Sequence, residues 1–328
     1  MSNLPLVSVV LPTYNRAYCI SRAITSVLNQ SYSNLELIII DDASSDNTGD
    51  IVKAIVDPRI FYKKIEKNRG PAGARNVGLA KAKGDLIAFI DSDDIWLPGK
   101  LAFQIDILQK YSRIDILFSD FININHIYKH IDTGFNQTHK GLKALKINKI
   151  LEDVFEIIGL FSKGLLIANF VPTPSVLLRS NLIKKIGCFN ELLIAAEDME
   201  FWLRADINNI NFAYTTQVFI ERHKDQTSLS ATSFFQLQNV LKALDVFYNN
   251  CLKSNRIDLL KYIKIAKGKV YQNMIKLHAL QGNKRGALQS FAHCWSYGGS
   301  WRSIYYLAGA FLGPRIIKLF KKGDLEKI

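Results

Sequence analysis

The sequence lacks the features that mark several classes of protein. Its first residues, MSNLPLVSVVLPT, enter a predicted strand almost at once, without the basic segment and cleavage site of a signal peptide. No run approaches the roughly 20 apolar residues that a helix needs to span a bilayer. The four cysteines (Cys19, Cys188, Cys251 and Cys294) are scattered and form no CxxC pair. We therefore expect reduced thiols in a cytoplasmic protein, and neither a zinc site nor a disulfide framework.

The chain also has no low-complexity segment and no internal repeat. Its 328 residues are 48% hydrophobic and 22% charged, the composition of an ordinary folded protein with one large domain or two. The net charge of +13 is unevenly placed. Residues 251–328 hold 15 basic and 3 acidic side chains, whereas residues 1–250 hold 27 and 26. This basic tail favours an anionic partner, either nucleic acid or a membrane surface.

The stretch from Gly84 to Pro98 carries the most distinctive chemistry. Its apolar run Leu86–Ile90 is typical of a strand buried on both faces of a parallel sheet. Asp91, Asp93 and Asp94 follow directly, and three carboxylates so close together repel one another unless a positive charge neutralises them. Oxygen ligands at the end of a buried strand suit a hard cation such as Mg2+ or Mn2+. The alternative is that these aspartates only cap the helix expected after Pro98.

Strands and helices are predicted to alternate along the first half of the chain. The strands expected from apolar runs are Val7–Leu11, Leu35–Ile40, Ile60–Tyr62, Leu86–Ile90 and Ile114–Phe118. Helices are expected over Ile20–Leu28 and Thr48–Val56, and from the end of a glycine-containing loop, Asn68–Asn76, to about Lys83. This alternation predicts an α/β fold with a mostly parallel sheet. The pattern is helical from about Ser233, so we expect a catalytic domain over 1–230 and a helical region over 231–328.

The predicted strand ends bring several functional groups to one edge of that sheet. They are Pro12–Asn15, Asp41–Asp42, the Arg69–Asn76 loop and Asp91–Asp93. Together they offer an aromatic ring, carboxylates, guanidinium groups and metal ligands, which a nucleotide diphosphate requires. A dinucleotide-binding domain is excluded because the turn after the first strand has no glycine, and a Walker A sequence is absent.

Four ordered motifs resemble the inverting family 2 glycosyltransferases of the GT-A fold. They are VSVVLPTYN (7–15), LIIIDDAS (37–44), NRGPAGARN (68–76) and FIDSDDIWLP (89–98), and a looser likeness continues to His223. The resemblance implies metal-dependent transfer from a nucleotide-sugar donor, for which a UDP-sugar is expected, to a glycan or lipid-linked acceptor. It places the protein in cell-surface polysaccharide or lipopolysaccharide synthesis. The chain has no QxxRW motif and no predicted membrane span, which favours transfer of a single sugar.

The resemblance also implies roles for individual residues on the donor side. Pro12 and Tyr14 would flank the nucleobase, and Asp42 would accept a hydrogen bond from the base or the ribose. Arg75 would approach the phosphates of the donor. The remaining donor-nucleotide ligands implied by the motifs are Asn15, Asp91 and Ser92. Asp91 and Asp93 would form the DXD pair that holds Mn2+ or Mg2+, with Asp93 as the more direct metal ligand.

On the acceptor side, the resemblance implies a catalytic pair, Glu197 and Asp198, with Asp198 as the base. The alternative is that both are favourable acids in the first turn of a helix. His223 would lie near the metal or the phosphates, or would be a histidine without either contact. A non-catalytic nucleotide- or glycan-binding module on the same scaffold is the competing hypothesis for the whole protein.

The basic tail predicts attachment to a membrane. The apolar run Ile304–Leu312 is too short to span a bilayer. After Pro314, apolar and basic residues alternate over 315–322 with the spacing of a short amphipathic helix. We expect residues 301–328 to bind the anionic cytoplasmic face of the cell membrane, where lipid-linked acceptors would be found; a solvated helical bundle is the alternative. No nucleic-acid-binding module is recognisable, so no nucleic-acid partner is expected.

Overall fold

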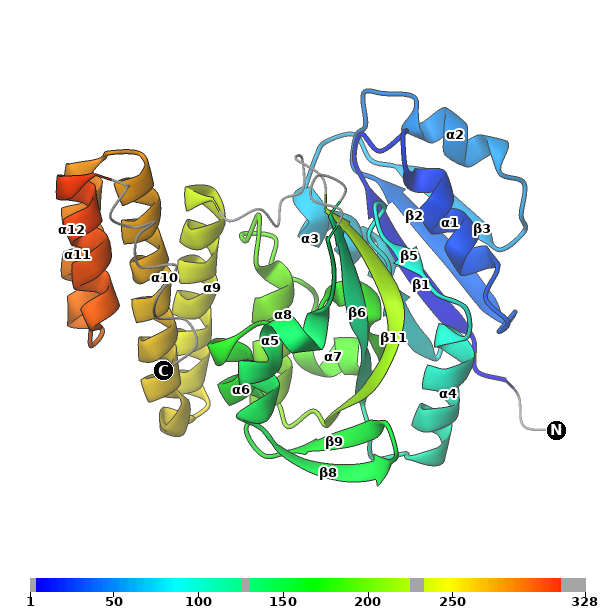
Figure 1. The fold of residues 1–328 in the computed structure, drawn as a ribbon. Helices are drawn as coiled ribbons and strands as arrows, with labels where there is room; N and C mark the ends of the chain where they lie inside the picture. The colour runs from blue at the N-terminus through cyan, green and yellow to red at the C-terminus, as the bar shows by residue number, and fades with distance from the viewer. Residues whose placement is uncertain (1–3, 126–129, 225–232, 314–328) are drawn as a thin grey trace. The chain divides into compact units, whose positions relative to one another are not determined.

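The computed structural model describes residues 4–125, 130–224 and 233–313 of the chain, which divides into two compact units, Met1–Ser228 and Leu229–Ile328. The first unit is built on a sheet of eleven strands (Figure 1). Its strands are β1 (Val7–Thr13), β2 (Leu35–Asp41), β3 (Ile60–Lys64), β4 (Leu86–Phe89), β5 (Ile95–Trp96), β6 (Ile116–Asn125), β7 (His130–Thr133), β8 (Lys146–Leu151), β9 (Val154–Ile158), β10 (Leu177–Arg179) and β11 (Phe212–Lys224).

Helices connect these strands and cover the sheet. They are α1 (Ile20–Leu28), α2 (Thr48–Ala54), α3 (Gly70–Leu79), α4 (Lys100–Lys110), α5 (Gly134–Lys143), α6 (Phe161–Ile167), α7 (Leu182–Ile186) and α8 (Glu197–Ile207), with a short 3-10 turn, η1 (Thr173–Ser175). The predicted α/β class is therefore confirmed.

The strand order is β3-β2-β1-β4-β10-β6-β11-β9-β8, with β5 paired to β11 and β7 paired to β6. The first four strands of this order are parallel, as expected from the alternating pattern. Beyond β4 the sheet is mixed, because β10 runs antiparallel to both of its neighbours. The sequence of Phe170–Leu178 predicts a loop entering a strand, and the structure places the turn η1 and the start of β10 there.

The first strand is longer than predicted. We expected it to end at Leu11, but it continues to Thr13 and includes Pro12. Proline has no N–H to donate, so it is tolerated in a strand where no neighbouring strand needs that hydrogen bond. The register with β4 ends at Val10, opposite Phe89, so the strand has already lost one neighbour when it reaches Pro12.

The glycine-containing loop predicted over Asn68–Asn76 is wrong, because α3 already begins at Gly70. Gly70 has a φ of +72°, which glycine adopts without steric cost, and Pro71 occupies the first turn, where its fixed φ suits a helix. The suggestion that the aspartates after β4 cap the next helix is also wrong. Strand β5 intervenes, and α4 has Gly99 at its N-cap.

The second unit consists of helices throughout the part that the structure describes. They are α9 (Phe234–Lys253), the 3-10 turn η2 (Ile257–Leu259), α10 (Leu260–Leu280), α11 (Lys284–Ser296) and α12 (Trp301–Leu312), and α10 packs against α9, α11 and α12. Ser233 and Asn283 cap α9 and α11 through their side-chain oxygens. None of the described helices is long and apolar enough to cross a bilayer. The amphipathic segment predicted over 315–322 lies outside the described residues.

Candidate active site

The parallel strands bring their carboxyl ends to one edge of the sheet. Thr13 of β1 lies opposite Asp41 of β2, and β4 ends at Phe89, just before the aspartates. Asp42, the next residue after β2, is buried, and its Oδ1 accepts a hydrogen bond from the N–H of Arg69 at 2.7 Å. Burial raises the pKa of Asp42, and this hydrogen bond only partly offsets the effect.

Strained backbone conformations occur in the segments that form the candidate site. Among the described residues, five that are not glycine have a positive φ, and three of them lie in the predicted site segments. Asn15 (51°) follows β1, Ala43 (66°) follows Asp42, and Ala196 (62°) immediately precedes the predicted catalytic pair. Such conformations are unfavourable for side chains with a Cβ and occur preferentially at functional sites.

The residues expected to contact the nucleobase differ in exposure. Tyr14 is 46% exposed, whereas Pro12 is buried within β1. Asn15 joins two loops: its N–H donates to Ser44 Oγ at 2.9 Å, and its Oδ1 accepts from the N–H of Ser45 at 2.8 Å. In this structure Asn15 therefore holds the loops after β1 and β2 together.

Arg75 of α3 joins the predicted metal-binding aspartates to the predicted catalytic pair. Its side chain is 5% exposed; one guanidinium nitrogen lies 2.7 Å from Asp91 Oδ1 and another lies 2.6 Å from Glu197 Oε1. The guanidinium carbon lies 5.5 Å from the centre of the Phe189 ring, a cation–π distance. Burial alone would lower the pKa of Arg75, but Asp91 and Glu197 outweigh burial, so the pKa is raised. The arginine is thus a buried cation held between two carboxylates.

The aspartates after β4 occupy distinct environments. The Asp91 side chain is 30% exposed, whereas Asp94 is buried. Asp94 accepts a hydrogen bond from the N–H of His223 at 3.3 Å, and the Nε of Arg222 lies 3.9 Å from its other oxygen. Burial raises the pKa of Asp94 well above its ordinary value, Arg222 opposes this, and Asp91 and Asp93 add to it. Asp94, to which the motifs give no role, thus connects residues 91–94, the aspartate turn, to β11.

Ser92, expected among the donor ligands, is buried, and its backbone carbonyl lies 3.4 Å from Cys19 Sγ. The hard carboxylate oxygens of Asp91 and Asp93 fit Mg2+ or Mn2+ by their chemistry. His223 Nε2 lies 3.4 Å from Glu221 Oε2. Within the described residues, no three His, Cys, Asp or Glu side chains are grouped closely enough to hold a metal ion, so the structure does not gather His223 with both aspartates.

Glu197 and Asp198, the predicted acceptor-side pair, lie at the start of α8, as expected. Glu197 is buried; burial raises its pKa to about 7, although Arg75 opposes the shift. Asp198 is partly exposed, and burial raises its pKa too, again against Arg75. Its Oδ1 accepts from the N–H of Met199 at 2.6 Å, and its Oδ2 lies 3.5 Å from Thr173 Oγ1.

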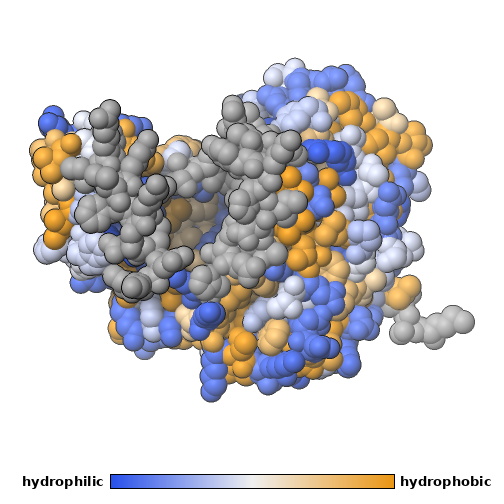
Figure 2. All heavy atoms as spheres, in the orientation of Figure 1, coloured by the Kyte–Doolittle hydropathy of each residue, from blue (hydrophilic) through white to orange (hydrophobic). Residues whose placement is uncertain are grey.

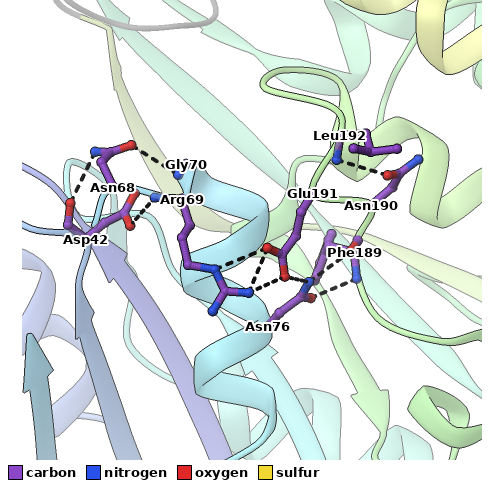
Figure 3. Close-up of polar contacts among 9 residues, drawn as sticks. All are labelled: Asp42, Asn68, Arg69, Gly70, Asn76, Phe189, Asn190, Glu191 and Leu192. Carbon is purple, nitrogen blue, oxygen red and sulfur yellow. Dashed lines mark hydrogen bonds and ion pairs between the residues drawn. The ribbon is translucent and has the colours of Figure 1, made fainter. Parts of the chain in front are cut away.

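The expected apolar wall stands behind this pair. Phe201 and Trp202 are fully buried, and Phe189 stacks on Phe201 with ring centres 4.4 Å apart. Figure 3 shows how Phe189 is held: its N–H and its carbonyl both bond to the Asn76 side chain, each at 2.9 Å. No local pattern pointed to Phe189, which lies far from α3 in sequence.

An open cleft of about 480 Å³ lies between α1, β5 and β11. None of the predicted site residues lines it, and Glu221, the neighbour of His223, is its link to the site. The candidate site is therefore defined by its side chains and not by this cleft.

Comparisons with known proteins agree with this arrangement. The sequence model described as "Glycosyl transferase family 2" matches residues 8–184. An Escherichia coli protein named UDP-Glc:alpha-D-GlcNAc-diphosphoundecaprenol beta-1,3-glucosyltransferase WfgD is 34% identical over 261 residues, 79% of this chain and 93% of that protein. WfaP, an E. coli protein with the same enzyme name, is 44% identical over 106 residues, 32% of this chain and 42% of that protein.

Among solved structures, S. aureus TarS residues 1–349 in complex with UDP-GlcNAc gives a TM-score of 0.62 at 17% identity, covering 93% of this chain and 91% of that chain. At this identity the likeness concerns the fold alone. It agrees with the GT-A fold expected from the four motifs.

The raised pKa of Glu197 predicts a pH-dependent stability. Between about pH 4.5 and 7 the folded state keeps the Glu197 proton while the unfolded state loses it, so stability falls as pH rises. Glutamine does not titrate, so the Glu197→Gln variant lacks this pH-dependent contribution to stability. We expect the difference in unfolding free energy between the wild type and Glu197→Gln to fall by up to about 3 kcal/mol as the pH rises over this range. Urea unfolding at several pH values measures it.

The control is Glu156→Gln. The Arg113 hydrogen bond lowers the pKa of Glu156, so its contribution is already complete above pH 4.5 and its difference from wild type should stay flat. A flat difference for Glu197→Gln as well would show that Glu197 is ionised throughout the range.

Proposed function

The chain belongs to glycosyltransferase family 2, and from this membership we propose that it moves a single sugar from a UDP-sugar to a hydroxyl group of a lipid-linked glycan. Two E. coli relatives support this choice, because their names specify a UDP-Glc donor and a GlcNAc acceptor on diphosphoundecaprenol. Such an acceptor belongs to the synthesis of cell-surface polysaccharide or lipopolysaccharide, the pathway proposed for this enzyme.

The observation that carries the proposal is the Arg75 bridge. One guanidinium contacts Asp91, on the proposed donor side, and Glu197, on the proposed acceptor side. A transfer reaction needs both substrates to meet at one point with fixed orientation. Arg75 links the two carboxylate sets within the length of one side-chain head group. From this position Arg75 would approach the phosphates of the donor.

The proposed base is Asp198. The acceptor hydroxyl attacks the anomeric carbon from the face opposite the leaving diphosphate, which inverts that centre. Asp198 accepts the proton of this hydroxyl, and its raised pKa makes it a stronger base near neutral pH than an ordinary aspartate. Thr173, 3.5 Å from Asp198 Oδ2, helps to orient the carboxylate.

The proposed metal ligands are Asp91 and Asp93. A divalent cation bound there would neutralise the charge that builds on the leaving diphosphate. Ser92, Asn15 and the strand ends around Tyr14 would form the wall of the donor pocket. Asp42 would orient the nucleoside through the carboxylate whose Oδ1 already accepts from Arg69.

Asp198→Asn should lose turnover by on the order of 100-fold or more, because an amide cannot accept the proton. Binding of UDP should be retained, since Asp198 lies on the acceptor side. Turnover is measured with a UDP-sugar and lipid-linked GlcNAc, and UDP binding by calorimetry. The control is Asp206→Asn, the same change on the same helix, where the buried carboxylate accepts from the N–H of Ser162.

Full activity in Asp198→Asn would place the base elsewhere. UDP binding without turnover in the wild type, for every donor and acceptor tried, would instead favour a non-catalytic binding module.

Asp93→Ala should abolish the metal dependence of nucleotide binding. We expect UDP to raise the melting temperature of the wild type in Mn2+ and to raise it much less in EDTA, because binding stabilises the folded state by mass action. In Asp93→Ala the two shifts should be equally small. Asp106→Ala, an exposed change on α4, is the control and should behave as wild type. A wild-type shift that is identical in Mn2+ and EDTA would remove the metal from the proposal.

Membrane attachment through residues 301–328 belongs to the same proposal. The described part of this segment, α12, exposes Trp301, Ile304, Phe311 and Leu312, and α11 beside it exposes Trp295. Figure 2 shows hydrophobic side chains on the side of the second unit that α11 and α12 occupy in Figure 1. Aromatic and apolar side chains beside cations are typical of surfaces that bind anionic membranes. Lys284 supplies such a cation, 5.6 Å from the Phe311 ring.

Changing Trp301 and Ile304 together to serine should weaken binding to anionic vesicles by on the order of tenfold or more, since each side chain contributes about 1.5–3 kcal/mol when fully buried. Flotation with phosphatidylglycerol vesicles, compared with phosphatidylcholine vesicles, measures this. Leu252→Ser, an exposed leucine on α9, is the control. Equal flotation of the wild type with both vesicle types, or unchanged flotation of the double variant, would contradict this surface.

A further inference from the structure

The loop between α7 and α8, residues 187–196, is tied firmly to α3. Figure 3 shows Arg69 and Glu191 meeting side by side: Arg69 Nη2 lies 2.7 Å from both Glu191 carboxylate oxygens, and Arg69 Nε lies 3.2 Å from one of them. Asn76 Nδ2 adds a bond to Glu191 Oε1 at 2.9 Å. Gly73 leaves room for this contact, since a Cβ there would lie 2.4 Å from Arg69 Cβ.

The same anchor reaches the proposed nucleotide site. The backbone N–H of Arg69, the residue whose side chain holds Glu191, donates to Asp42 Oδ1 (Figure 3). A bidentate guanidinium–carboxylate pair fixes geometry as well as attracting charge. Residues 187–196 are therefore a positioned loop, although the ion pair itself is partly exposed and adds little stability.

This positioned loop holds two apolar side chains in solvent. Leu192 is 86% exposed and Ile194 is 53% exposed, while Leu193 and Ala195 between and after them are buried. Local bonds keep this arrangement: Asn190 accepts from the N–H of Leu192 through its side chain and from that of Leu193 through its carbonyl, both at 3.1 Å. A loop that could rearrange freely would gain by burying such surface, so the anchor maintains its exposure.

The exposed pair lies next to the chemistry. Ile194 precedes the proposed base Asp198 by four residues, a reach of at most roughly 14 Å along an extended chain. In the proposed lipid-linked acceptor, the sugar that carries the reacting hydroxyl is joined through a diphosphate to an apolar isoprenoid chain. When that hydroxyl meets Asp198, the chain must leave the site across a neighbouring surface. The helix that leads into the loop, α7, offers two exposed cations, Lys184 and Lys185, for an anionic head group.

We propose that Leu192 and Ile194 form a binding site for the isoprenoid chain of the acceptor, and that the Arg69–Glu191–Asn76 anchor holds this site in place beside the base. The inference rests on the proposed lipid-linked acceptor and names the surface that receives its apolar part. Single exposed apolar residues are common on proteins. Leu192 and Ile194, however, lie on an anchored loop that leads directly into α8, the helix that carries the proposed base.

The test is equilibrium binding of a polyprenyl diphosphate that carries no sugar, in detergent micelles, to the full-length protein. The variant in which Leu192 and Ile194 are both changed to serine should bind it at least about tenfold more weakly than wild type. Val56→Ser, a change at an apolar residue of the same unit that is 95% exposed, should bind as wild type. Both variants should retain the wild-type melting temperature and UDP affinity, since neither change touches the donor side.

A second measurement tests the anchor. Arg69→Glu and Glu191→Arg should each weaken the binding of polyprenyl diphosphate, and the two changes together should restore part of it by re-forming the pair with reversed charges. In transfer assays, the change of Leu192 and Ile194 to serine should raise KM for a long-chain acceptor and leave KM nearly unchanged for a short-chain acceptor with the same head group.

Unchanged binding by the Leu192 and Ile194 variant, an equal loss in Val56→Ser, or no saturable binding by the wild type would overturn the proposal. Because this binding assay needs no turnover, it separates the inference from the proposed function. Wild-type protein that binds the polyprenyl diphosphate through these two residues but transfers no sugar would contradict the function and retain the site.

Discussion

The candidate site depends on one buried cation. Arg75 is almost inaccessible to solvent and meets Asp91 and Glu197 at hydrogen-bonding distance. Each of these charges would be costly to bury alone, and removing one member of such a group leaves the others uncompensated. The three side chains come from α3, from the turn after β4 and from the first turn of α8. The ionic contact therefore fixes the positions of three elements, two of which are more than 100 residues apart along the chain.

The sheet positions the residues of that contact. Parallel strands β1, β2 and β4 end at one edge of the sheet, so Asp42 and Asp91, which follow β2 and β4, both lie at that edge. Antiparallel β10, inserted between β4 and β6, carries η1 at its start and so brings Thr173 near Asp198. η1 is itself held by Trp96, whose Nε1 donates to the carbonyl of Pro174 at 3.1 Å. The proposed acceptor side is thus held by the second, mixed half of the sheet.

The sequence predicted those features that depend on neighbouring residues. Apolar runs such as Leu35–Ile40 predict buried strands, and Asp41 and Asp42 at the end of such a run predict ligand binding at that edge of the sheet. The prediction failed at Asn68–Asn76, because glycines usually mark loops, whereas here Gly70 starts α3 with a positive φ and Gly73 allows close packing in its first turns. Glu191 could not be found from the sequence, because its partner Arg69 lies 122 residues away and no local pattern encodes that contact. Contacts of this kind depend on the topology of the sheet.

The balance of charge also bears on the proposed donor. Asp91, Asp94, Glu197 and Asp198 interact with one another and with the guanidinium groups of Arg75 and Arg222, and Asp93 adds a further negative charge beside Asp94. Raised pKa values let Asp94, Glu197 and Asp198 keep their protons to higher pH than ordinary carboxyl groups, so the negative charge of this set grows as each of them ionises. A nucleotide diphosphate is itself anionic, so the aspartate turn would repel its phosphates. A divalent cation that accompanies the diphosphate would remove this repulsion, and the carboxylate oxygens of Asp91 and Asp93 are the ligands that such a cation prefers. The repulsion between the aspartate turn and the donor phosphates is therefore a physical argument for the proposed metal-bound donor.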